Sequence, residues 1–198
     1  MKTAAILLLL TSLAATAGAQ SSGARLVGDP QITLDAFNAR RQRTQRIGMI
    51  ALASWAGLNI VGGSALYFLD EANQSFHQMN AMWNVVNAGL ATGGLIGASR
   101  ELTGWDLTRS IEAQHNLEKV YLVNAGLDLG YIMGGLFLAQ LGDEYPARAD
   151  QFEGWGYSIA LQGGFLMLFD AVMFIAHRRN REYRPLLSAS QTLGDMSD

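Results

Sequence analysis

From Ala72 to Ser99 the chain carries no Asp, Glu, Lys or Arg. A soluble helix of that length needs a charged outer face to meet water. Apolar windows run over residues 47–69, 79–98, 120–141 and 155–176. Each window is near the ~20 residues that a helix needs to cross a bilayer core. The sequence therefore predicts an all-α fold, a transmembrane four-helix bundle, with an unusually apolar soluble bundle as the alternative.

Composition supports the membrane interpretation and excludes several kinds of site. Charged residues make up 16% of the chain, whereas soluble domains contain roughly 25%. Glycine is frequent, at 22 residues, and proline is rare, at 3, which favours glycine-rich packed helices. The absence of cysteine excludes disulfides, thiolate metal sites and Fe–S clusters.

The first 19 residues resemble a secretory signal peptide. A lysine precedes an apolar run over residues 4–10, and Ala17-Gly18-Ala19 precedes Gln20, as in a small-x-small cleavage site. The alternative is a retained, short first helix. The rest divides into a polar, basic and partly helical segment at 20–46, a membrane domain at 47–177, and a basic, then disordered tail at 178–198.

Arginine is concentrated on one side of the predicted membrane domain. We define side A as the N-terminal segment, the middle connection and the tail, and side B as the other two connections. The arginines of side A are Arg25, Arg40, Arg41, Arg43, Arg46, Arg100, Arg109, Arg178, Arg179, Arg181 and Arg184, whereas side B has only Arg148. The positive-inside rule puts side A in the cytoplasm, but a cleaved signal peptide puts it outside. Either a retained first span or a failure of the charge rule would resolve this conflict.

An internal similarity suggests two tandem helical hairpins. The stretch "WAGLN" at 55–59 resembles "NAGLD" at 124–128, and each precedes a glycine pair, Gly62-Gly63 or Gly134-Gly135. Such repeats would be related by an axis along the membrane normal. Chance similarity between glycine- and alanine-rich spans is the alternative.

Polar residues follow one face of several windows. Asn80, Asn84 and Asn87 are spaced i, i+4 and i+7, and Asn124, Asp128 and Tyr131 repeat this spacing. Because unpaired polar groups are costly in hydrocarbon, these faces should turn inward and bond across helices. The predicted intramembrane polar cluster comprises Asn59, Asn80, Asn84, Asn87, Asn124, Asp128, Gln162 and Asp170.

The two carboxyl groups of this cluster, Asp128 and Asp170, lead to the most specific functional hypothesis. An intramembrane carboxyl group can act in a proton relay, a cation site or a substrate anchor. The alternative is a protonated, purely structural Asp bonded to Asn59, Asn87 or Asn124.

Glycine forms separate faces with G-x3-G-x3-G spacing, which permits close contact between helices. The predicted helix-packing residues are Gly89, Gly93, Gly97, Gly126, Gly130 and Gly134. They could pack within one chain or join copies in a homo-oligomer.

No catalytic residue, metal ligand or cofactor is predicted. His115 and His177 share side A while His77 lies on side B, so facing haem ligands are limited to one pair. Glu112 and His115 give a single Glu-x-x-His motif, whereas di-iron bundles use two. We find no phosphate loop or dinucleotide motif. Tyr67, Trp83 and Tyr121 lie near window ends, as interfacial aromatic residues do.

The stretches "SWAGLNIVGG", "FHQMNAMWNVVNAGLA", "NLEKVYLVNAGLDLGYIMGG" and "WGYSIALQGGFLMLFD" resemble a group of small bacterial four-span membrane proteins of unknown function. The resemblance covers residues 40–180 and brings no known activity. It implies a multi-pass protein of the bacterial inner membrane, with the lipid bilayer as partner and no nucleic acid.

Two functional hypotheses follow. The first is a non-enzymatic structural or assembly role through the glycine faces, with a homo-oligomer as partner. The second is a small carrier or channel for an ion or polar solute, using the polar cluster. A membrane-embedded enzyme is a third, weaker hypothesis, because no reactive constellation supports it.

Overall fold

The structure, a computed structural model, describes residues 30–100 and 103–181, and within these ranges it contains four long helices and no strand. The long helices are α2 (Pro30–Leu69), α3 (Gln74–Ala98), α4 (Leu107–Glu144) and α5 (Ala149–Arg181). Two short 3-10 helices, η2 (Glu71–Asn73) and η3 (Pro146–Arg148), join them in pairs. The all-α prediction is confirmed. The predicted signal segment and most of the predicted tail lie outside the described residues.

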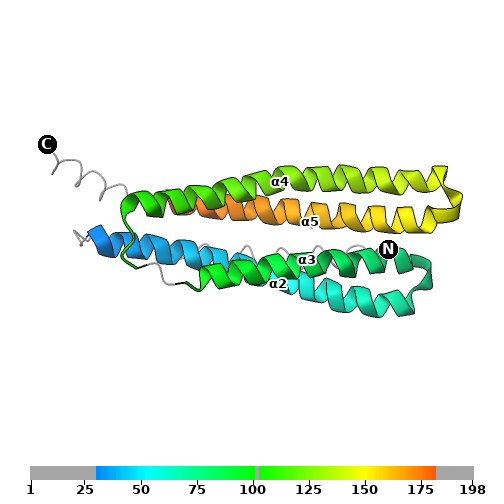
Figure 1. The fold of residues 1–198 in the computed structure, drawn as a ribbon, viewed down its shortest axis with the longest axis horizontal. Helices are drawn as coiled ribbons and strands as arrows, with labels where there is room; N and C mark the ends of the chain where they lie inside the picture. The colour runs from blue at the N-terminus through cyan, green and yellow to red at the C-terminus, as the bar shows by residue number, and fades with distance from the viewer. Residues whose placement is uncertain (1–29, 101–102, 182–198) are drawn as a thin grey trace.

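The helices form two antiparallel hairpins, α2–α3 and α4–α5, which lie side by side along their length (Figure 1). Helix α3 also packs against α5, so the hairpins meet mainly through one helix of each. Helix α4 begins after Asp106, whose Oδ1 accepts a hydrogen bond of 2.8 Å from the backbone N–H of Arg109. This N-cap satisfies a backbone donor that the first helical turn would otherwise leave unpaired.

The two glycine pairs of the predicted repeat have matching surroundings. Gly62 and Gly134 face open space. Their neighbours face the partner helix of each hairpin: a Cβ on Gly63 would lie 2.9 Å from the carbonyl oxygen of His77, and one on Gly135 would lie 2.6 Å from that of Gly156. Each hairpin therefore brings its helices together at the second glycine of its pair.

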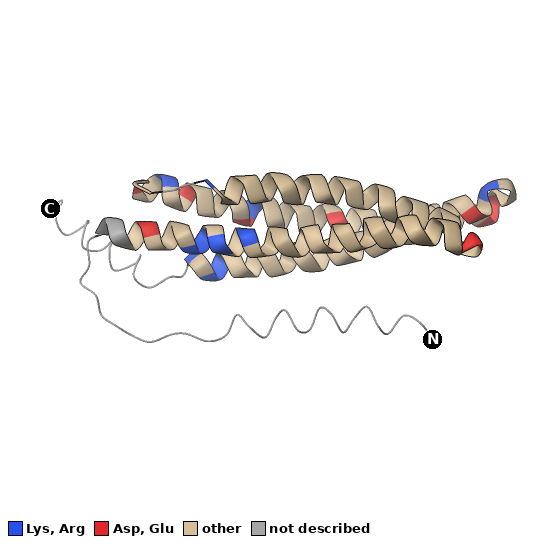
Figure 2. Cartoon of the chain, turned by 90° about the horizontal axis from the view of Figure 1, so that it is seen from below, with Lys and Arg blue, Asp and Glu red and all other residues tan. Residues whose placement is uncertain are grey.

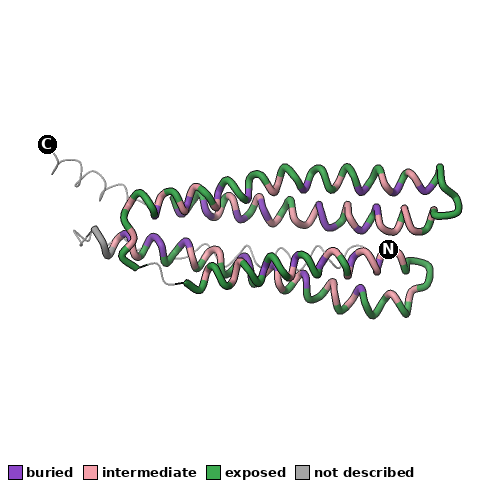
Figure 3. Tube along the Cα trace, in the orientation of Figure 1, coloured by how far each residue is buried: buried purple, intermediate pink, exposed green. Residues whose placement is uncertain are grey.

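Many polar side chains are buried in the interior of this protein, beside an apolar cluster that includes Met49, Leu52 and Met173, and large apolar side chains cover its outside. Asn84, Gln114 and Gln162 are fully buried, whereas Leu58 and Val61 are about 70% exposed. The exposed positions extend along the outward faces of all four helices (Figure 3). Soluble proteins show the opposite pattern, so this surface suits hydrocarbon better than water.

Three of the helical stretches are long and apolar enough to cross a membrane: residues Thr33–Leu69, Leu107–Glu144 and Pro146–Arg181. Their length and composition indicate a membrane protein. Helix α3 is not among them, because Asn80, Asn84 and Asn87 lower its mean hydropathy although it carries no charged residue.

Arginine is concentrated at one end of the hairpins. Within the described residues, Arg148 is the one arginine at the end that holds both hairpin turns. The other arginines gather toward the opposite end, around the start of α2 and the end of α5 (Figure 2). At that end, Leu34 and Phe37 of α2 pack against Leu107 and Ile111 of α4, so the bundle extends beyond the predicted windows.

Candidate functional site

An amide relay links the two hairpins near the middle of the bundle. The indole Nε1 of Trp55 donates to Gln162 Oε1 at 2.9 Å, and Gln162 Nε2 donates to Asn80 Oδ1. Asn80 Nδ2 in turn donates to Asn59 Oδ1 at 2.9 Å. The relay thus joins α2, α3 and α5 through side chains that bond to one another. Three residues of the predicted polar cluster, Asn59, Asn80 and Gln162, therefore bond across helices here.

The relay continues along α3 toward a groove. Asn84 Nδ2 donates to the carbonyl oxygen of Asn80 at 2.8 Å, and Asn87 Nδ2 donates to Asn84 Oδ1 at 3.2 Å. Asn84 is fully enclosed, while Asn87 also lines the groove. The side-chain amides of Asn84 and Asn87 therefore donate to groups on α3 itself. Together they extend the polar face from the relay to the groove.

The groove lies between α3 and α4 and has a volume of about 290 Å³. It exists because α3 packs against α2 and α5 rather than against α4. Its walls come from residues spaced three or four apart, which share one helix face. Helix α3 contributes Asn87 and Leu90, and helix α4 contributes Asn124, Leu127 and Asp128.

Aromatic residues bound the groove at both ends. Trp83 of α3 meets Tyr131 of α4 edge to face, with ring centroids 5.0 Å apart. Toward side A, Tyr121 OH donates to Gln45 Oε1 at 2.7 Å, and its ring stacks on His177. The ring of Tyr121 is buried in the bundle and does not face outward; its position at the membrane interface stays a prediction.

The floor of the groove holds the two carboxyl groups of the predicted polar cluster, Asp128 and Asp170, which are 3% and 5% exposed. The two carboxyl groups are close enough to interact electrostatically, and two carboxyl groups that share one site do not readily both carry a charge. Asp128 Oδ2 has no hydrogen-bond partner among the described residues. Among the described residues, no hydrogen bond joins either Asp to Asn59, Asn87 or Asn124, so the structural alternative with an Asp bonded to one of these amides is not what the structure shows. A buried, unpartnered acceptor of this kind is costly without a donor.

The predicted helix-packing glycines lie on the outside of the bundle. A Cβ on any of them would meet no atom within 4 Å in the described chain, and this holds for Gly89, Gly93, Gly97, Gly126, Gly130 and Gly134. The close contacts within the chain come from other glycines, among them Gly63, Gly135 and Gly156. A role of the six in joining copies of the chain stays a prediction.

The three histidines lie apart, and the described residues hold no group of three or more His, Asp and Glu side chains that could bind a metal ion. On side B, His77 Nε2 lies 3.1 Å from Asp70 Oδ2. Hydrogen bonds from His77 and then from Asn73 lower the pKa of Asp70. This contact ties the α2–α3 turn to the first turn of α3.

Sequence reasoning missed Gln45 and Trp55 as site residues. Trp55 lies four residues before Asn59 and so shares its helix face, a signal that could have identified it. Gln45 lies in the polar segment before the first window. The sequence predicts that this segment is a helix continuing into the first window, but it does not show that Gln45 meets Tyr121 beside the groove.

A model of a family of unknown function, DUF6992, matches residues 51–171. The chain belongs to the DUF6992 family. The prediction of an uncharacterised family is therefore confirmed. No curated protein matches the chain, and no solved structure does. The DUF6992 region contains the amide relay, both carboxyl groups and every groove residue except Gln45 and Met49.

Proposed function

We propose that this DUF6992 protein spans the membrane four times and binds a small, membrane-soluble amphiphile in the groove between α3 and α4. The ligand's polar group would be a cation or a strong hydrogen-bond donor. The observation that carries the proposal is the buried Asp128 oxygen that no described residue satisfies. A donor from a ligand would satisfy this oxygen at the floor of the groove.

The walls of the groove favour an organic ligand over a bare ion. A bare cation needs several oxygen ligands around it, but Val86, Leu90 and Leu127 surround much of this space. Binding pockets for small organic molecules combine such apolar walls with a few polar groups. The rim residues Val86 and Leu127 are more than half exposed, so a ligand could enter sideways from the lipid.

Helix α3 would form the fourth span despite its asparagines. Asn80, Asn84 and Asn87 are buried and bonded, so their polarity would not face lipid. The exposed residues include Val85 and Ile96. This arrangement, with the sequence resemblance, supports a multi-pass protein of the bacterial inner membrane.

The test uses protein in lipid nanodiscs and two ligands with the same alkyl chain, octylammonium and octanoate. We expect saturable binding of octylammonium alone. Because Asp128→Asn replaces the carboxyl group by an amide of the same shape, it should weaken this binding at least about tenfold, which is ~1.4 kcal/mol. The matched control is Asp143→Asn, an exposed Asp on the same helix, which should change nothing. Equal binding by wild type and Asp128→Asn would reject the groove as the site.

A second proposed function is assembly of several copies through the outward glycine faces. It is supported by the open space beside Gly93 and Gly130, since small-x3-small faces allow close helix contact in membranes. We expect Gly93→Leu and Gly130→Leu to shift the protein toward monomer in gentle detergent, measured by light scattering. Gly57→Leu, at an outward glycine outside these faces, should leave the mass unchanged. A wild-type protein that is monomeric at all concentrations would exclude this role.

A further inference from the structure

A second pocket lies on the opposite side of the α4–α5 hairpin, near the basic end of the protein. It has a volume of about 300 Å³, and α4 and α5 are the helices that line it. Its nitrogen-bearing side chains are His115 and Lys119 of α4 and Arg178 and Arg181 of α5. On each helix these residues are three or four positions apart, so they share one face.

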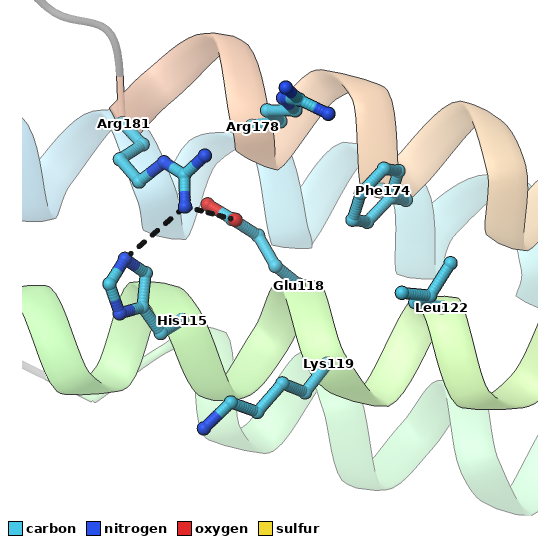
Figure 4. Close-up of a pocket in the computed structure, with 7 residues that line it drawn as sticks. All are labelled: His115, Glu118, Lys119, Leu122, Phe174, Arg178 and Arg181. Carbon is cyan, nitrogen blue, oxygen red and sulfur yellow. Dashed lines mark hydrogen bonds and ion pairs between the residues drawn. The ribbon is translucent and has the colours of Figure 1, made fainter.

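A buried carboxylate holds one of these cations in place. Glu118 Oε2 lies 3.3 Å from Arg181 Nη1, and Glu118 Oε1 accepts a hydrogen bond of 3.3 Å from Gln114 Nε2. Figure 4 shows Arg181 reaching from α5 across to Glu118 and His115 on α4. Among the described residues, the lining of the pocket thus contains three cationic side chains and one carboxylate, whose two oxygens are already engaged.

The pocket becomes apolar toward the middle of the bundle. Leu122 and Phe174 line that part, further along both helices from the basic groups (Figure 4). Lys119 lies one residue before the predicted window at 120–141, and Arg178 lies two residues after the window at 155–176. The change from basic to apolar lining therefore coincides with the predicted boundary between headgroups and hydrocarbon.

We propose that this pocket binds the phosphate headgroup of an anionic membrane lipid, with an acyl chain against Leu122 and Phe174. Basic pockets between transmembrane helices suit such headgroups, and Arg181 can offer planar, paired N–H donors to phosphate oxygens. A free phosphate ion would contact only the basic side chains, and Leu122 and Phe174 would not add to its binding.

The test is native mass spectrometry of the full protein with phosphatidylglycerol, against phosphatidylcholine with the same acyl chains. We expect preferential binding of phosphatidylglycerol. The double variant Lys119→Gln/Arg178→Gln should weaken it about 30-fold, the effect of two basic residues near an anionic lipid. The matched control is Arg43→Gln/Arg46→Gln, which removes the same charge from exposed positions on α2 that do not line the pocket and should weaken binding much less than the double variant does. Circular dichroism checks that both variants keep their helices.

Three results would overturn the proposal. Equal binding of the two lipids would remove the headgroup preference, and equal losses in both double variants would indicate diffuse charge attraction. Displacement of the lipid by millimolar glycerol phosphate, which has no acyl chain, would assign the pocket to a free phosphate compound. Asp128→Asn should leave lipid binding unchanged, so failure of this proposal and failure of the groove proposal are separable.

Discussion

Replacing Gly156 by leucine is expected to force α4 and α5 apart and to lower the free energy of unfolding by about 3 kcal/mol, the upper end for overpacked cores. A Cβ at Gly156 would lie 2.5 Å from the carbonyl oxygen of Gly135 and closer still to the backbone nitrogen of Ala139. These are backbone atoms of the facing helix, so no side chain can turn away to make room. The helices themselves must shift.

The measurement is unfolding in mixed micelles, followed by tryptophan fluorescence. Gly164→Leu is the matched control, because it makes the same change on the same helix where a Cβ meets nothing within 4 Å. We expect the control to stay within about 0.5 kcal/mol of wild type, as surface substitutions do. Equal stability of the two variants would mean that α4 and α5 do not cross closely at Gly156.

Replacing Asn124 by tryptophan is expected to fill the groove and to abolish binding of octylammonium while the helices stay intact. Asn124 lines the groove, is half-buried, and makes no side-chain hydrogen bond to other described residues. The loss of the side chain should therefore cost little, whereas the indole ring would occupy much of a cavity of about 290 Å³. We expect affinity to fall by at least about 100-fold, or ~2.7 kcal/mol.

Val123→Trp provides the control for this change. Val123 is the preceding residue, is 61% exposed and does not line the groove. The same ring should point toward lipid there and leave the affinity unchanged. If both variants bound octylammonium as wild type does, the ligand would occupy another part of the protein, whatever the effect of Asp128→Asn.

The sequence predicts the helices and the inward polar face well, because both depend on local periodicity. Asn80, Asn84 and Asn87 could be placed inside because an unpaired amide facing lipid is costly. The groove could not be predicted in this way. The groove exists because α3 packs against α5 and not against α4. The spacing of Asn124 and Asp128 along α4 does not show which helix lies next to this face.

Glycine illustrates the same limit. The G-x3-G-x3-G spacing of Gly126, Gly130 and Gly134 marks a small face, but it does not say whether another helix covers it. Gly135 follows Gly134 directly, yet a step of ~100° around the helix turns it from open space toward the backbone of α5. Which small face becomes the contact depends on tertiary packing.

The division into two hairpins has a consequence for biosynthesis. Each hairpin is closed by a short turn, so α2 can pair with α3 before α4 has been synthesised, and domains of multi-part chains generally form as units in this order. The groove has one wall from each hairpin and is therefore completed last, after the second hairpin docks. Mutations that slow this docking should yield newly synthesised protein that has normal helix content but no complete groove. Such protein would bind no ligand and would be exposed to quality-control proteases.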